Sequence, residues 1–222
     1  MVEGGDDMII FRKLEETLQQ FNVDVLSAEG RDTLLEVFIR RDEIGGRQKF
    51  AFIADKDWWV CASIPTSFIS PDLIFTDGYS IENDVYRDGN LFGYMTPAER
   101  TRFFQELHKV IGCYALGLSR IMGGRPGRIA MHPNEILDDA TRHANFMQLE
   151  AGEEYPTQLR DQIAADHGKL LRGKTLMGVL IRQLSARGRV ARHNSLSLME
   201  VVSNNRGPLL NRLFNDAERI FA

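Results

Sequence analysis

The sequence is poor in the side chains that bind zinc or form disulfide frameworks. Its 222 residues include two cysteines, Cys61 and Cys113, which lie far apart without a CxxC or CxxH spacing. The five histidines are scattered singly along the chain. A zinc site is therefore not expected, and both cysteines are predicted to be reduced structural thiols.

Long hydrophobic runs are also missing. No apolar stretch reaches the roughly 20 residues of a membrane-spanning helix, and Met1–Asp7 is acidic and glycine-rich, unlike the basic start of a signal peptide. We therefore expect a cytoplasmic protein that does not bind a membrane. A hydrophobic content of 43% with 26% charged residues is typical of a folded globular chain.

Positive charge is scarce over most of the chain and is concentrated near its carboxyl end. The formal net charge is −4, yet residues 160–222 contain eleven Lys or Arg against five Asp or Glu. A basic segment beside an acidic body indicates either contact with a polyanion such as nucleic acid or the solvated faces of ordinary helices. Both interpretations stay open.

A short apolar run, Phe50–Ala54, predicts a strand that is buried on both faces of a parallel sheet. It ends in the acidic sequence Asp55-Lys56-Asp57. Side chains alternate along an extended backbone, so both aspartates are expected to point in one direction and Lys56 in the other.

Two further strands are predicted, Asn22–Ala28 before this run and Leu73–Thr76 after it. The residues between the first two strands, Arg31–Arg41, have helical spacing, and Gly45-Gly46 is expected to end this unit. Strand, helix and strand in this order predict a βαβ crossover with parallel strands.

Helices are predicted over most of the remaining chain. Ser80 is expected to cap a short helix with Asn83 as its third residue, which places Glu82 in the first turn. Thr96-Pro97-Ala98-Glu99 has the pattern of a capping box with proline at the first helical position. The other predicted helices are Met8–Gln20, Thr96–Met122, a helix entered by Gly173-Lys174, Ser195–Asn204 and Pro208–Phe221.

Acidic residues follow each of the three predicted strands: Glu29, then Asp55 and Asp57, then Glu82. The carboxyl ends of parallel strands share one edge of a sheet, which is where open α/β sheets bind ligands. Four carboxylates at one edge repel one another unless cations lie between them, and oxygen ligands suit Mg²⁺ or Mn²⁺. Two such ions can bind a phosphate and promote its hydrolysis.

In this order of motifs the sequence resembles the TOPRIM fold, which occurs in topoisomerases, primases and nucleases of the OLD type. The motifs are Glu29-Gly30, Asp55-Lys56-Asp57 and Tyr79-Ser80-Ile81-Glu82-Asn83, and residues 22–87 carry most of the resemblance. Gly173-Lys174 before a helix also fits. The pattern is most similar to AriB-like nuclease subunits of PARIS anti-phage defence systems.

The resemblance implies an α/β fold with a TOPRIM-like core over residues 1–95 and a mainly helical region over residues 96–222. It implies a Mg²⁺-dependent nuclease that uses about two ions on DNA or RNA, and an effector role in anti-phage defence. An ABC-type, OLD-like ATPase is the implied partner, with a possible homodimer. The implied metal ligands and catalytic residues are Glu29, Asp55, Asp57 and Glu82, with Asp32 as a further ligand and Lys174 as a catalytic cation.

The sequence departs from the family at one position. Many relatives have an acid four residues after the glutamate, and here that residue is Thr33, so Asp32 either replaces it or caps the helix. A non-catalytic TOPRIM-like subunit that docks on an ATPase is therefore the alternative function. A topoisomerase or primase fragment fits less well, because the sequence lacks a clear nucleophilic tyrosine context and a zinc-binding region.

Overall fold

The computed structural model describes residues 1–44 and 48–222, so the predicted break at Gly45-Gly46 lies outside the described residues. The chain is a mixed α/β protein that is mostly helical, with a small parallel sheet. It divides into two units, which are described separately: residues 1–89 with 196–222, and residues 90–195. Across the described residues no helix is long and apolar enough to cross a membrane.

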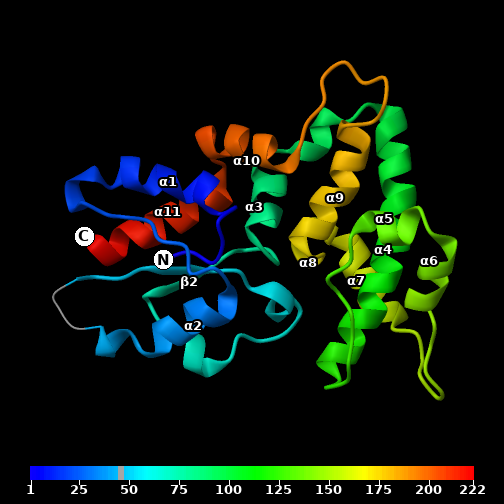
Figure 1. Cartoon of the computed structure of the whole chain (residues 1–222), viewed down its shortest axis with the longest axis horizontal. Helices are drawn as coiled ribbons and strands as arrows, with labels where there is room; N and C mark the ends of the chain where they lie inside the picture. The colour runs from blue at the N-terminus through cyan, green and yellow to red at the C-terminus, as the bar shows by residue number, and fades with distance from the viewer. Residues whose placement is uncertain (45–47) are drawn as a thin grey trace. The chain divides into compact units, whose positions relative to one another are not determined.

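The first unit contains two parallel strands and five helices among its described residues. Figure 1 shows α2 on one face of the strands, with α1 and α11 on the other. The elements are α1 (Met8–Thr17), α2 (Arg31–Ile39), β1 (Phe52–Ala54), β2 (Leu73–Phe75), α3 (Ile81–Asp88), α10 (Ser195–Asn204) and α11 (Pro208–Phe221).

The amino-terminal residues extend this sheet in a way that the sequence analysis missed. Val2 forms parallel bridges with both Ser27 and Ile53, so it lies between the segment at Ser27 and β1. The Val2 amide donates to the Leu26 carbonyl at 2.8 Å, and the Ala28 amide donates to the Val2 carbonyl at 2.8 Å. Four parallel segments therefore end at one edge: residues 26–28, residues 1–3, β1 and β2.

The prediction of a regular strand over Asn22–Ala28 is wrong. Only Ser27 is bridged, and Asn22 has a left-handed backbone with φ of 52°. Val2 occupies the position beside β1 that a βαβ crossover would have given to this segment. The predicted packing of the helix after this segment on the following strand is confirmed. α2 packs on β1, where Leu34, Phe38 and Phe52 lie in one buried cluster.

Most predicted helices are confirmed with small shifts at their ends. Ser80 is the N-cap of α3, as predicted, and forms a capping box with Asn83. Thr96 and Glu99 form the predicted capping box at the start of α4. Gly173 begins α9, as predicted. Cys61 and Cys113 are free thiols, and burial raises the pKa of each to about 11.

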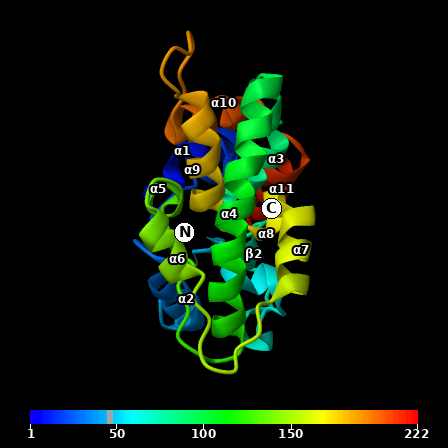
Figure 2. The same cartoon turned by 90° about the vertical axis from the view of Figure 1, so that its right-hand side faces the viewer.

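The second unit is helical and is built on the long helix α4 (Figure 2). Buried side chains of α4, including Phe103, Leu107, Val110 and Tyr114, form its core. The elements are α4 (Pro97–Met122), α5 (Pro133–Leu137), α6 (Ala140–Phe146), α7 (Thr157–Ala165), α8 (His167–Leu170) and α9 (Gly173–Leu184).

The carboxyl-terminal helix returns to the first unit, whereas the predicted division placed all of residues 96–222 in one region. Its amphipathic face buries Leu210, Leu213 and Phe214, and the Phe214 ring stacks on Phe11 of α1. The Asp88 carboxylate at the end of α3 accepts from the amides of Leu209 and Leu210 at 3.1 and 2.8 Å, and so caps α11 from outside.

We expect Asp88→Ala to lower the free energy of unfolding by about 1 kcal/mol, because two amides in the first turn of α11 lose their acceptor. Urea denaturation followed by circular dichroism measures this change. Asp24→Ala is the control, since Asp24 is an exposed acid in the same unit. Equal effects of the two substitutions would contradict the assigned role of Asp88.

Candidate functional site

Glu3 and Asp55 lie together at the carboxyl edge of the parallel segments. Glu3 follows the bridged residue Val2, and Asp55 follows the last residue of β1. The Glu3 carboxylate accepts a hydrogen bond from the Asp55 amide at 2.8 Å. Both side chains are partly exposed, so solvent can reach this edge.

The loop from β2 to α3 closes over the same edge. The Ile81 amide donates to Asp55 Oδ1 at 2.9 Å, and the Asp57 amide donates to the Tyr79 carbonyl at 2.7 Å. Glu82, in the first turn of α3, is 6% exposed and accepts a hydrogen bond from the Ser80 hydroxyl. The capped start of α3 thus places a third carboxylate, which is buried, near Asp55.

Burial and neighbouring carboxylates raise the pKa of Asp55 and of Glu3. Burial raises the pKa of Asp55 well above its usual value, and the negative charges of Glu3, Glu82, Asp7 and Asp57 raise it further. Burial likewise raises the pKa of Glu3 to about 7, although the hydrogen bond from Asp55 opposes the shift. We call these five residues the acid cluster.

Asp57 differs from the others because an arginine neutralises it. Arg31 Nη1 lies 2.6 Å from Asp57 Oδ2, and the Arg31 side chain is 14% exposed. The backbone leaves the extended conformation at Lys56, with φ of −68° and ψ of −28°, and Asp57 has a left-handed φ of 50°. The prediction that strand alternation aligns Asp55 with Asp57 is therefore wrong.

A buried acid outside the cluster holds the loop in place. The Asp84 carboxylate accepts from the amides of Asp77 and Gly78 at 2.9 and 2.8 Å. A Cβ on Gly78 would lie 2.5 Å from the Cβ of Asn83, so only glycine allows the loop to pass this close to α3. This contact fixes the approach of the loop to β1.

The remaining predicted site residues are not members of the acid cluster, although Glu29 follows the parallel segment beside Glu3 and the amide of Gly30 donates to the Glu3 carbonyl at 2.8 Å. Glu29 is exposed, with a left-handed φ of 59°, and its roles as ligand and catalytic residue stay predictions. Asp32 is exposed in the first turn of α2, where an acid suits the helix dipole. Lys174 is exposed in the first turn of α9, within the second unit. Lys56 Nζ donates to the Asp77 carbonyl at 3.1 Å.

Glu3 and Asp7 are the site residues that the sequence analysis missed, although a signal for them was present. The family pattern of a Glu-Gly pair with an acid four residues later is met by Glu3-Gly4 and Asp7, whereas Glu29-Gly30 is followed by Thr33. The Asp7 carboxylate accepts from the Gly4 amide at 2.8 Å, which holds the turn into α1.

The acid cluster is not already shaped around an ion. Within residues 1–44 and 48–222, no three Asp, Glu, His or Cys side chains are arranged to hold a metal. Asp57 faces Arg31, Glu82 accepts from Ser80, and Asp55 accepts from Ile81. Binding of a cation by several of these acids therefore requires side chains to turn away from their present partners.

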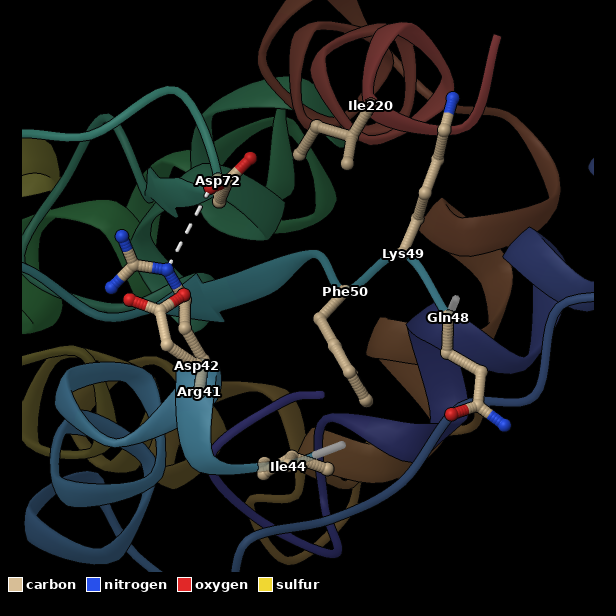
Figure 3. Close-up of a pocket in the computed structure, with 8 residues that line it drawn as sticks. All are labelled: Arg41, Asp42, Ile44, Gln48, Lys49, Phe50, Asp72 and Ile220. Carbon is tan, nitrogen blue, oxygen red and sulfur yellow. Dashed lines mark ion pairs between the residues drawn. The ribbon is translucent and has the colours of Figure 1, made fainter. Parts of the chain in front are cut away.

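A separate hollow of about 490 Å³ lies at the amino ends of β1 and β2, away from the acid cluster (Figure 3). Its wall includes Lys49, Phe50 and Ile220, and an ion pair of 3.8 Å joins Arg41 to Asp72 there. Oppositely charged side chains line this hollow together, so it has no single charge to offer a ligand.

Much of the basic carboxyl segment is paired within the protein. Arg182 binds Glu106 at 3.2 Å and Asp138 at 2.8 Å, for example. Arg187 and Arg192 differ, because both are exposed in the loop that connects α9 to α10 (Figure 2). This loop is the part of the segment best suited to contact a polyanion.

The chain matches no protein family, no curated protein and no solved structure. The geometry of the acid cluster is therefore the main basis for a functional assignment.

The raised pKa of Glu3 predicts a pH dependence of stability. The Glu3 carboxyl has a pKa of 4.5 in its ordinary, exposed state and about 7 in the folded chain. The folded chain therefore binds the Glu3 proton more tightly than the unfolded chain does. The stabilisation is complete below about pH 4.5 and is lost as the pH rises through about 7. In EDTA, Glu3→Gln should therefore be more stable than wild type at pH 8, by on the order of 1–2 kcal/mol.

Urea denaturation at pH 4.5 and pH 8 tests this expectation, with Glu29→Gln as the matched exposed control. The difference between Glu3→Gln and wild type should appear at pH 8 and be small at pH 4.5, where Glu3 is mostly protonated. A difference that does not change with pH would contradict the assignment of a raised pKa to Glu3.

Proposed function

We propose that this protein is a Mg²⁺- or Mn²⁺-dependent nuclease with a TOPRIM-like core. It would hydrolyse phosphodiester bonds of DNA or of RNA, and tRNA is one of the candidate substrates. One observation carries this proposal: Glu3 and Asp55 are held side by side at the carboxyl edge of the strands. Asp7, Asp57 and Glu82 lie near enough to raise the pKa of Asp55. Open α/β sheets bind their ligands at this edge.

The donor set fits a hard divalent cation. Every member of the acid cluster offers carboxylate oxygen, and no described thiol or imidazole belongs to the cluster. A cation would offset the repulsion that now raises the pKa of Glu3 and Asp55. When bound, it would supply Lewis-acid stabilisation of the charge on a phosphate. Glu3 and Asp55 are the residues that would hold it, because the hydrogen bond from the Asp55 main-chain amide keeps the Glu3 carboxylate beside Asp55.

The further roles rest on the resemblance. The resemblance to OLD-type TOPRIM nucleases and AriB-like subunits implies that an ATPase partner binds and controls this protein. It also implies a role as an effector of anti-phage defence. Glu3-Gly4 and Asp7 supply the acid spacing that Glu29-Gly30 lacks, and this strengthens the resemblance. Lys174 lies in the second unit, and its role as an additional cation rests on the resemblance alone.

A non-catalytic subunit that docks on an ATPase is the second candidate, and the ion pair between Arg31 and Asp57 favours it. That pair neutralises one acid of the cluster without any metal. In this alternative the acid cluster would have only a structural role. Conservative substitutions of its residues would change the free energy of unfolding, and the protein would not hydrolyse nucleic acid.

We expect Asp55→Asn and Glu3→Gln each to lower the rate of nucleic-acid hydrolysis in Mg²⁺ or Mn²⁺ by at least about 100-fold, because each removes a proposed ligand. Asp24→Asn should change the rate by no more than about twofold, since Asp24 is an exposed acid outside the acid cluster. The assay measures cleavage of plasmid DNA, single-stranded RNA and tRNA by purified protein, with and without EDTA.

A wild-type protein that cleaves none of these substrates, alone or with its ATPase partner, would favour the docking subunit. A loss of activity with Glu29→Gln that equals the loss with Glu3→Gln would instead restore Glu29 as the ligand. Circular dichroism of each variant separates loss of chemistry from loss of fold.

Arg187 and Arg192 are expected to contribute to substrate binding through phosphate contacts. The double substitution Arg187→Ala, Arg192→Ala should weaken binding of a DNA or RNA oligonucleotide and reduce the slope of log affinity against log salt by about 1.5. Arg142→Ala with Arg160→Ala is the control, because these two arginines already pair with Asp139 and Asp161. Equal effects of the two double variants would contradict a role for the α9–α10 loop.

A further inference from the structure

Arg31, the first residue of α2, is a cation that belongs to the acid cluster itself. Its Nη1 donates to Asp57 Oδ2 at 2.6 Å, and its Nη2 donates to the Lys56 carbonyl at 3.4 Å. Its guanidinium carbon lies 3.9 Å from the centroid of the Trp59 ring. Three contacts from the segment after β1 therefore fix one guanidinium.

These contacts stabilise the charge of Arg31 in a place with little access to solvent. The side chain is 14% exposed, and removing either charge would leave the other poorly compensated. The Trp59 ring adds a cation–π contact and is itself held between Phe68 and Phe75, with ring centroids 5.4 and 6.0 Å away. Arg31 cannot leave Asp57 without breaking this packed arrangement.

Asp57 is the acid of the cluster that the Arg31 guanidinium contacts directly. Asp55 instead accepts a hydrogen bond from the Ile81 amide, and the Glu3 carboxylate accepts one from the Asp55 amide. The guanidinium is thus committed to Asp57, while Glu3 and Asp55 accept hydrogen bonds from uncharged amides.

We infer that Arg31 takes the place of a second divalent cation, so that the site holds one ion, on Glu3 and Asp55, and reserves Asp57 for the guanidinium. This inference rests on the proposed function. It reduces the number of bound metal ions to one, whereas the resemblance implied about two.

Manganese binding to the full-length chain tests the inference without any activity assay. Free Mn²⁺ is measured by electron paramagnetic resonance during titration at pH 7.5. Wild type should bind one ion per chain. Arg31→Gln should bind two, because Asp57 loses its internal cation and becomes available as a ligand.

The chain offers a matched control in Arg41. Its guanidinium carbon lies 4.4 Å from the Phe38 ring centroid, and its Nε faces Asp72 at 3.8 Å (Figure 3). Arg41→Gln is thus the same chemical change at an arginine with the same types of contact, but at the opposite edge of the strands. It should leave one ion per chain.

Two bound ions in wild type, or a single ion in both wild type and Arg31→Gln, would overturn the inference. No bound ion in either protein would overturn the proposed function as well, which distinguishes the two failures. If Arg31→Gln does not fold, the same Mn²⁺ titration of Asp57→Asn tests the inference. Circular dichroism checks that this variant is folded. Asp57→Asn should keep one ion with an affinity within about threefold of wild type, and a loss of tenfold or more would show that Asp57 is a ligand.

Discussion

Repulsion between the carboxylates of Glu3 and Asp55 is the constraint on which the candidate site depends. Strand pairing brings the two residues to one edge, and a hydrogen bond from the Asp55 amide keeps the Glu3 carboxylate there. Burial and neighbouring acids then raise the pKa of both groups. The folded chain therefore benefits from any positive charge that it can bind at this edge, whether a proton or a cation.

Arg31 shows that the protein solves part of this problem with its own residues. Its ion pair with Asp57 compensates one acid, and the ring of Trp59 holds the guanidinium in place. The loop before α3 completes the arrangement, because Asp84 binds the amides of Asp77 and Gly78 and so fixes the distance between the loop and β1. Fold and site are thus stabilised by the same contacts.

Local patterns made α1–α4, α9–α11, the two strands and the capping residues predictable, but not α5–α8. Apolar spacing marks α11, and the side chains of Ser80 and Thr96 mark the starts of α3 and α4. The placement of Val2 between Ser27 and β1 was not predictable in this way, because it depends on pairing between distant segments. A segment of three residues is also too short to show the alternation of a strand.

The same limit explains which site residues were found. Asp55, Asp57 and Glu82 follow recognisable strands or a helix start, so their place at one edge could be predicted. Glu3 required the knowledge that the first residues of the chain enter the sheet. The pairing of Asp57 with Arg31 depends on the left-handed turn at Asp57, which residue spacing alone does not reveal.

Anomalous diffraction from a crystal soaked in Mn²⁺ tests the central claim most directly. The account predicts a manganese peak bound by the carboxylates of Glu3 and Asp55, with Asp57 still paired to Arg31. A crystal without manganese at this edge, in which Glu3 and Asp55 share a proton instead, would show that the repulsion is relieved without a metal ion and would contradict the account.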